Sequence, residues 1–303
     1  MIDDKALIYN ISVDTGLHQK HVIDIIRRAP SSYKVFHIEK RSGGYREIAQ
    51  PSKDVKLIQR WLIDKILEEK LPIDGATTAY KKGSSIKVNA EKHKNSNHLV
   101  KIDFTNFFPS ITIIDITSHL NKFLGCYLDE TAVNIVSRLC SWKKSRGNYV
   151  LCIGAPTSPI ISNSILYEFD KKISHFCTQE NAVYTRYADD ITISSESHGV
   201  VNKYLSIITD VLANLEYPRI TINNKKTIFA SRSGRRFITG ITLTPTHEIS
   251  IGRDRKRLIR AMYHRYLSGN LGEDEQKKMF GLISFAEDIE PGFSHRLKKK
   301  NDV

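Results

Sequence analysis

Two acidic residues stand side by side in the segment Tyr187-Ala188-Asp189-Asp190, between the β-rich runs 183–187 and 191–195. Those runs predict a hairpin with the carboxylates at its tip. Adjacent carboxylates repel each other, so they require either full solvation or a nearby cation. Taken alone, the segment is consistent with a solvated turn or with a metal site.

A third acid, Asp103, follows the short apolar run 99–102 and precedes the aromatic-rich stretch 104–108. The run predicts a strand that ends in a carboxylate. Two strand-borne carboxylates can share two Mg²⁺ ions about 4 Å apart, an arrangement that serves in-line phosphoryl transfer. Asp103 therefore favours the metal site over the solvated turn.

Alternating strands and helices are predicted to position these acids. A hairpin is expected from 33–38 and 45–48 around the turn Arg41-Ser42-Gly43-Gly44. Two short helices around Thr15-Gly16, stopped by Pro30, precede it. They are consistent with a helix-turn-helix-like cap, and a packing unit is favoured over a DNA-reading one. Helices are predicted over 55–66, 86–93, 130–141, 158–177 and 202–215, with a further one opened by Pro109. Strand-like pieces are predicted at 220–222, 228–230, 237–243 and 248–251.

The charge balance points to a polyanionic partner. The 303 residues include 46 Lys and Arg against 33 Asp and Glu, a net charge of +13, and 40% are hydrophobic, which excludes a disordered basic tail. Residues 253–265, RDRKRLIRAMYHR, hold seven Lys, Arg and His residues and one acid. This lopsided charge favours a nucleic-acid-binding helix over a solvated surface helix, with apolar positions at Leu258, Ile259, Met262 and Tyr266.

The cysteines and the N-terminal residues indicate the cellular compartment in which the protein is expected. Cys126, Cys140, Cys152 and Cys177 stand far apart, without zinc-ligand spacing, and are expected to be reduced thiols. The start, MIDDKALIYNIS, is acidic where a signal peptide is basic, and no apolar run has the length of a membrane span. A cytoplasmic protein without a membrane partner is expected.

Four ordered segments resemble the palm motifs of reverse transcriptases. They are Asp103 in DFTNFF, Gly154-Ala155-Pro156-Thr157-Ser158-Pro159 continuing to Asn163, Tyr187 to Asp190, and Asn223 to Thr227. Two more strings resemble the bacterial retron branch. Asn89-Ala90-Glu91-Lys92-His93 fits N-A-x-x-H, and Ile238-Thr239-Gly240 nearly fits V-T-G. The resemblance covers about residues 33 to 290.

The resemblance implies an α+β right-hand polymerase fold with fingers, a palm built on an antiparallel sheet, and a short helical thumb. It places N-terminal helices and fingers in 1–98, the palm with inserted fingers helices in 99–240, and the thumb in 241–303. The implied activity is RNA-directed DNA synthesis from dNTPs with two Mg²⁺ ions. Asp103 and Asp189 would be direct metal ligands, Asp190 the supporting acid, and the backbone carbonyl of Phe104 would complete a metal site.

The same resemblance implies substrate contacts. Phe108 would lie under the sugar of the incoming nucleotide and exclude a 2'-OH, although a core phenylalanine is the alternative. Arg46, assisted by Lys40 or Arg41, would grip the triphosphate, although surface arginines are common in hairpins. Lys226, with Lys225 as its rival, would lie near the leaving pyrophosphate. Gly154 and Ser158 would let the backbone approach the substrate closely. Ile153 departs from the family, which has Gln there, so an altered grip on the nucleotide is expected.

The retron-like strings imply a dedicated partner RNA. Asn89 and His93 would bind this structured non-coding RNA, although a helix cap and a core histidine are equally consistent with the string. Arg253, Arg257 and Arg260 would contact phosphates of the RNA and of the RNA/DNA hybrid. In the retron branch, synthesis starts from an internal 2'-OH and gives branched RNA-DNA, msDNA, and the complex commonly restrains a separate effector protein in anti-phage defence. The alternatives are another bacterial reverse transcriptase, intron-encoded or of a defence type, and an RNA-binding scaffold with a weakened palm, prompted by Ile153.

Overall fold

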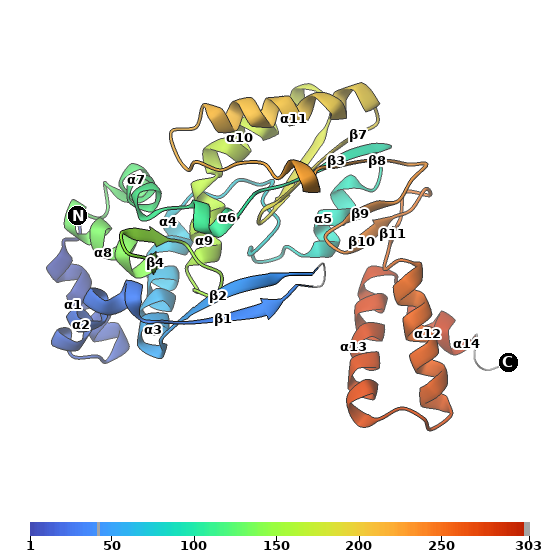
Figure 1. The fold of residues 1–303 in the computed structure, drawn as a ribbon, viewed down its shortest axis with the longest axis horizontal. Helices are drawn as coiled ribbons and strands as arrows, with labels where there is room; N and C mark the ends of the chain where they lie inside the picture. Colours follow the sequence, from blue (N-terminus) through green and yellow to red (C-terminus); the bar gives the residue numbers. More distant parts are fainter. Residues whose placement is uncertain (41–42, 300–303) are drawn as a thin grey trace.

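A four-stranded antiparallel sheet in the order β6-β7-β3-β8 lies at the centre of the molecule (Figure 1). Its strands are β3 His98–Asp103, β6 Val183–Tyr187, β7 Asp190–Ser195 and β8 Ile228–Ser231. The computed structural model describes residues 1–40 and 43–299, so the predicted turn residues Arg41 and Ser42 lie outside the described residues. The α+β class and the β6–β7 hairpin with its acidic tip are confirmed.

Helices cover both faces of this sheet. Helices α10 Tyr167–Gln179 and α11 His198–Ala213 pack on one face, where Ile191 and Ile193 of β7 join the main core (Figure 1). Helix α5 Ile86–His93 reaches the opposite face, where Ser194 points. Because both faces are covered, β7 is buried from Ile191 to Ser195, which explains its nearly continuous run of β-formers.

The N-terminal region consists of a helical layer and a long hairpin. Its elements are α1 Asp4–Thr15, α2 Gln19–Arg28, the 3-10 turn η1 Ala29–Ser31, β1 Tyr33–Glu39, β2 Tyr45–Pro51, α3 Lys53–Leu62, the π-helical turn η2 Ile63–Leu67 and α4 Glu68–Lys70. Helices α1 and α2 pack against α3, as expected of a packing unit. The β1–β2 hairpin extends away from these helices (Figure 1).

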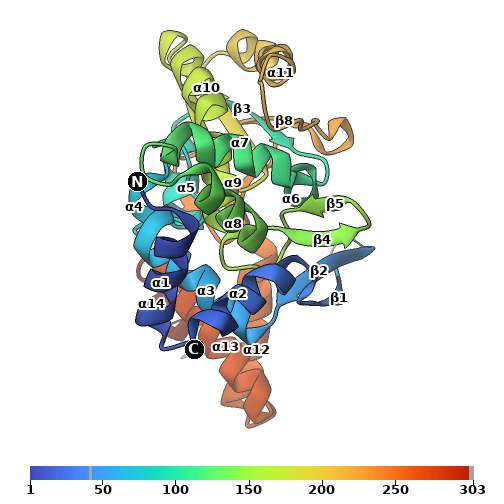
Figure 2. The same cartoon turned by 90° about the vertical axis from the view of Figure 1, so that its left-hand side faces the viewer.

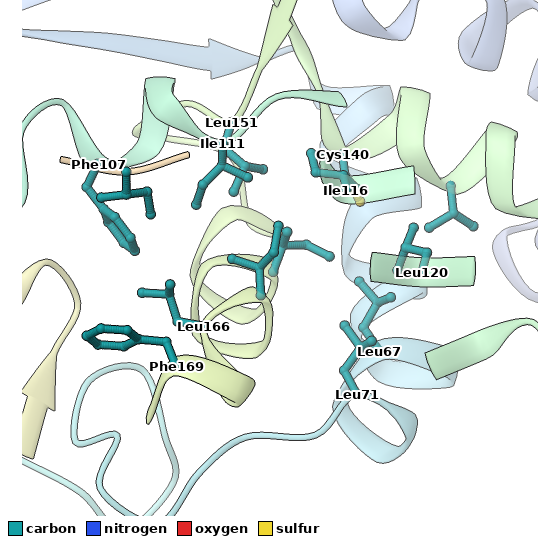
Figure 3. Close-up of a cluster of buried hydrophobic side chains, with 14 of the residues drawn as sticks. Leu67, Leu71, Phe107, Ile111, Ile116, Leu120, Cys140, Leu151, Leu166 and Phe169 are labelled. Atoms are coloured by element: carbon teal, nitrogen blue, oxygen red, sulfur yellow. The ribbon is translucent and has the colours of Figure 1, made fainter. Parts of the chain in front are cut away.

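Further helices and a small hairpin link this region to the sheet. They are α6 Phe107–Ser110, α7 Ile113–Leu124, α8 Glu130–Cys140, β4 Trp142–Ser145, β5 Asn148–Val150 and α9 Ser158–Ile165. Ala49 of β2 packs with Trp142 and Val150 in a small core, so the two hairpins lie side by side (Figure 2). The main core runs through all these helices, and Figure 3 shows Phe107 and Phe169 at its palm end.

The C-terminal region is a small sheet followed by a helical hairpin. Its elements are η3 Asn224–Lys226, β9 Arg236–Ile238, β10 Ile241–Leu243, β11 Ile249–Ser250, α12 Arg253–Leu267, α13 Glu273–Ile289 and α14 Phe293–Lys299. The α12–α13 pair projects away from the rest of the molecule (Figure 1). The boundary proposed at 240/241 cuts the β9–β10 hairpin, so the helical unit starts at α12. No helix within 1–40 and 43–299 combines the length and apolarity of a membrane span.

Several predicted elements are divided or shifted. The helix predicted over 158–177 breaks at Leu166, where the backbone leaves helical geometry (ψ +9°). The strand predicted over 237–243 turns back at Thr239 and Gly240, which both have positive φ. Pro109 does not open a helix: it lies inside the four-residue α6, and α7 begins after the Thr112 capping box. The piece 220–222 forms only an isolated bridge, between Ile222 and Phe104.

Candidate active site

Two strand ends bring the three predicted acids together. In the antiparallel register, Asp103 at the end of β3 lies opposite Asp190 at the start of β7. Asp189 occupies the β6–β7 turn next to Ala188, which has a left-handed φ of +57°. The Phe104 N–H donates to the Asp189 carbonyl at 3.3 Å, so the turn is tied to the end of β3. The predicted grouping of Asp103, Asp189 and Asp190 is therefore present.

Burial and neighbouring acids raise the pKa values of Asp189 and Asp190. Burial raises the pKa of Asp189, and the Asp103 carboxylate adds to this effect against Lys226 and Arg46. Burial also raises the pKa of Asp190, to about 6, with Asp189 as the next largest cause and Lys101 opposing. The site therefore concentrates negative charge that a cation would stabilise.

Lys226 supplies one cation to this site. Its Nζ donates to both Asp103 carboxylate oxygens, at 3.0 and 3.1 Å, from the 3-10 turn η3. The lysine side chain is 62% exposed whereas the Asp103 side chain is 13% exposed, so the ammonium reaches the acid from the solvent side. Lys226 thus lies next to the acids.

The oxygen donors at this point fit a hard divalent cation. The Phe104–Ile222 bridge uses the Asp103 carbonyl, which accepts from Asn223, and the Thr105 N–H, which donates to Thr221, so the Phe104 carbonyl is left out of the bridge. Across 1–40 and 43–299, no three His, Cys, Asp or Glu side chains form a closed metal cluster. Asp103, Asp189 and the Phe104 carbonyl could hold Mg²⁺, because the Asp103 carboxylate is close enough to raise the pKa of Asp189 and because Mg²⁺ prefers oxygen ligands.

A cleft of about 910 Å³ opens over the acids. Its walls come from the β1–β2 hairpin, the segment after β3, the loop before α9 and the turn η3. Residues that line it include Lys40, Tyr45, Arg46, Tyr80, Phe104, Phe108, Trp142, Ile153, Asp189 and Lys226. The structure thus brings Lys40, Arg46, Phe108 and Lys226 to the same cleft as Asp189.

Gly154 lies where the loop before α9 packs against strand β2, and Ser158 is the first residue of α9. Gly154 has φ +121°, and a Cβ there would come within 2.8 Å of the Ala49 carbonyl in β2. Ala49 also donates to the Ile153 carbonyl at 2.9 Å. Ser158 is 1% exposed and is not among the residues that line the cleft, so the structure does not bring its side chain to the substrate cleft. Residue 154 has to be glycine because strand and loop pack closely here.

Asn89 and His93 do not face RNA. His93 is fully buried, and its ring nitrogens lie 2.7 Å from the hydroxyls of Ser194 and Thr185. Burial lowers its pKa to about 3. Asn89 is 1% exposed and its amide donates to the Thr239 hydroxyl at 3.3 Å. Direct RNA contact by these two side chains is therefore a wrong prediction, since their i, i+4 spacing places both on the buried face of α5.

The helix predicted over 253–265 is present as α12, but one of its predicted apolar positions is exposed. Arg253, Arg257 and Arg260 are exposed on α12, at spacings that place them on one side of the helix. Ile259 and Met262 are buried, but Leu258 is 46% exposed.

Sequence reasoning missed the support behind the acidic β6–β7 turn. Arg186 is fully buried, and its Nη1 donates to the Ala188 carbonyl at 2.9 Å. Its Nη2 donates to Asp170 at 2.6 Å and to the Asn163 carbonyl at 3.1 Å. The guanidinium therefore connects the acidic turn to α9 and α10. The only sequence signal was an arginine inside an otherwise buried strand.

Comparisons with known proteins agree with this geometry. Residues 38–261 match the family described as reverse transcriptase (RNA-dependent DNA polymerase). Retron Ec83 reverse transcriptase of Escherichia coli is 38% identical over 96% of this chain and 95% of its own length. Retron Ec73 reverse transcriptase of Escherichia coli is 33% identical over 97% and 94%. A telomerase structure from Candida albicans covers 88% of this chain and 56% of its own, with a TM-score of 0.49 at 12% identity. The first three matches establish that the chain belongs to the bacterial retron reverse transcriptases, which are RNA-directed DNA polymerases.

Proposed function

We propose that this enzyme copies a dedicated structured non-coding RNA that serves as both primer and template. Synthesis would begin at an internal 2'-OH of that RNA and give a branched RNA-DNA, msDNA. The similarity to retron reverse transcriptases over nearly the whole chain supports this proposal.

One observation carries the assignment of the site: three carboxylates meet beneath a hairpin that carries Lys40 and Arg46. Asp103, Asp189 and the Phe104 carbonyl would hold two Mg²⁺ ions, with Asp190 as the supporting acid. Bound Mg²⁺ would stabilise the attacking and leaving oxygens of the phosphoryl transfer.

The other cleft residues would bind and orient the nucleotide. Arg46 and Lys40 offer guanidinium and ammonium donors to the triphosphate of a dNTP. Phe108 would lie beneath the sugar. The Lys226 ammonium would offset the negative charge that develops on the leaving pyrophosphate. Gly154 has an exposed backbone beside the cleft, where it can approach the substrate.

Further partners belong to the same proposal. The exposed arginines of α12 would follow the phosphates of the RNA and of the RNA/DNA hybrid. The complex would act with a separate effector protein in anti-phage defence, in the cytoplasm, where the free cysteines would stay reduced.

The test is to sequence the nucleic acid that copurifies with the wild-type protein and with Asp189→Asn. We expect branched DNA linked to a short RNA with the wild type, and the unextended RNA alone with Asp189→Asn. The exposed Asp210→Asn on α11 is the matched control and should resemble the wild type.

Other outcomes identify the alternatives. Linear DNA without a linked RNA would contradict priming from the 2'-OH. RNA without any DNA in the wild type would favour a binding scaffold with a weakened palm. DNA synthesis that persists in Asp189→Asn would contradict the assignment of the metal ligands.

A further inference from the structure

Tyr80 combines a strained backbone with an exposed ring in the cleft wall. It is a non-glycine residue with φ +56°, in the left-handed region, and it is 55% exposed. Tyrosine gains nothing from that backbone conformation, in which its Cβ is crowded. Strained residues persist where the surrounding structure fixes them, and they concentrate at functional sites.

The segment before Tyr80 is fixed by buried hydrogen bonds. The Thr78 N–H donates to the Arg186 carbonyl at 2.8 Å, and the Asn163 amide donates to the Ala79 carbonyl at 2.9 Å. Thr78 and Ala79 are both buried. Arg186 and Asn163 also belong to the hydrogen bonds behind the acidic turn, so the Tyr80 backbone and that turn are held by one network.

The cleft around Tyr80 has charged and apolar parts. Arg46, Lys40 and Lys226 provide cations, and Asp189 provides a carboxylate. A nucleotide base needs a flat apolar surface instead. Tyr80 and Ile153 line the same cleft, and Ile153 has no hydrogen-bonding side chain, so it contributes only apolar contact.

Tyr45 is the other exposed tyrosine in the cleft wall and does not share these features. It is 70% exposed, lies on strand β2 with regular pairing to Glu39, and has no left-handed backbone. Its exposure is ordinary for a hairpin strand, whereas the position of Tyr80 is held against a conformational cost.

We propose that Tyr80 is a further substrate-contacting residue of this polymerase, whose ring stacks on the base of the incoming deoxynucleoside triphosphate. The proposal rests on the cleft being the polymerisation site. It deepens that assignment, because it names the surface that receives the base while Arg46 and Lys40 receive the phosphates.

The test is steady-state primer extension with dNTP concentration varied, using Tyr80→Ala and Tyr80→Phe. Loss of a base-aromatic stack should raise the KM for dNTP in Tyr80→Ala by roughly 5- to 150-fold. Tyr80→Phe keeps the ring and should stay within about twofold of the wild-type KM. Tyr9→Ala is the matched control, because Tyr9 is 56% exposed on α1, and it should leave the KM unchanged.

A glycine variant separates substrate contact from a structural role. Tyr80→Gly removes the ring and suits a positive φ, so the melting temperature should not fall while the KM rises as in Tyr80→Ala. An unchanged KM in both Tyr80→Ala and Tyr80→Gly overturns the proposal. An equal rise in Tyr80→Phe also overturns it, since the hydroxyl would then be the contact. A weaker affinity for the primer-template with an unchanged KM for dNTP would place the ring against a nucleic-acid strand instead.

The assignment of the polymerisation site and the proposed stacking contact can be contradicted independently. Continued synthesis by Asp189→Asn would contradict the site itself. A wild-type KM in Tyr80→Ala, with Asp189→Asn inactive, would contradict the stacking contact alone.

Discussion

Single residues determine the charge balance of the cleft. The carboxylates of Asp189 and Asp190 have raised pKa values because each is buried and faces another acid. Lys226 contacts Asp103 directly, whereas Arg46 acts on Asp189 from the hairpin. Positive residues from distant parts of the chain therefore surround a negative centre, as transfer of a phosphoryl group requires.

We expect Phe108 to set the sugar selectivity of the cleft. Its ring is half-buried, 5.3 Å from that of Phe107, and still lines the cleft. Phe108→Ala should admit ribonucleotides, because the contact with a 2'-OH contributes on the order of 1 to 3 kcal/mol to discrimination. The measurement is the ratio of kcat/KM for dNTP and rNTP, with Phe176→Ala on α10 as the control. An unchanged ratio would identify Phe108 as a core residue only.

At the scale of elements, the palm depends on a hairpin whose turn is supported from behind. Arg186 and Asp170 are both fully buried and joined at 2.6 Å, and the Tyr184 hydroxyl donates to Asp170 at 2.5 Å. Removing one partner of a buried ion pair leaves the other charge without compensation. The left-handed Ala188 therefore depends on a network outside the cleft.

Arg186→Ala should accordingly lower the free energy of unfolding by about 3 to 5 kcal/mol. Urea denaturation measures this change. The control is Lys203→Ala, which breaks the exposed Lys203–Glu180 pair and should cost at most about 1 kcal/mol. A loss for Arg186→Ala as small as that of the control would show that the network does not support the turn.

Helix α12 divides its basic residues between two tasks. Arg255 donates to the Gly240 carbonyl at 2.7 Å and Lys256 pairs with Glu290 at 2.6 Å, so these two hold the helix in place. Arg253, Arg257 and Arg260 remain exposed and available to phosphates.

Replacing these three exposed arginines by Gln should weaken RNA binding and flatten the plot of log K against log salt. Each lost phosphate contact should remove roughly 0.7 to 0.9 from the slope. Binding measured at several salt concentrations tests this. Lys171→Gln with Lys172→Gln, exposed on α10 over the other face of the sheet, is the control for net charge. Equal slopes for all three proteins would place the RNA away from α12.

At the scale of the whole molecule, the two retron-like strings meet at the joint between the palm and the C-terminal helices. Asn89 contacts Thr239, and Gly240 accepts from Arg255. Ala90 shares a core with Ile238 and with Ile259 of α12. Residues of the two strings therefore contact helix α12 and pack against it. These contacts help to fix the position of the α12–α13 hairpin and of its exposed arginines.

The buried histidine of this joint predicts how global stability depends on pH. The pKa of His93 is about 3 in the folded protein and about 6.5 when unfolded, so only the unfolded chain binds a proton between these values. The contribution of His93 to the free energy of unfolding is fully present above about pH 6.5 and decreases as the pH drops toward 3. Between pH 7.5 and 5 the loss from His93 should be about 2 kcal/mol.

Urea unfolding of His93→Gln at the two pH values checks this prediction. The variant should lose about 2 kcal/mol less than the wild type on acidification, because glutamine does not titrate. His295→Gln, an exposed change on α14, should follow the wild type. Identical pH dependence of His93→Gln and wild type would contradict a buried neutral imidazole.

The sequence by itself determined the acidic centre, because its residues lie at the ends of strands whose periodicity is local. Asp103, Asp189 and Asp190 could be located from runs of β-formers, and the hairpin with Arg46 from its turn chemistry. The basic face of α12 followed from helical spacing in the same way. Only the tertiary structure decided which polar residues are buried. Asn89 and His93 looked available for ligands, but their hydrogen-bond partners come from distant segments, and Ser158 is buried as well. Tyr80 and Arg186 went unnoticed for the same physical reason: a strained backbone and a buried ion pair depend on contacts between residues far apart in the chain, which no local pattern records.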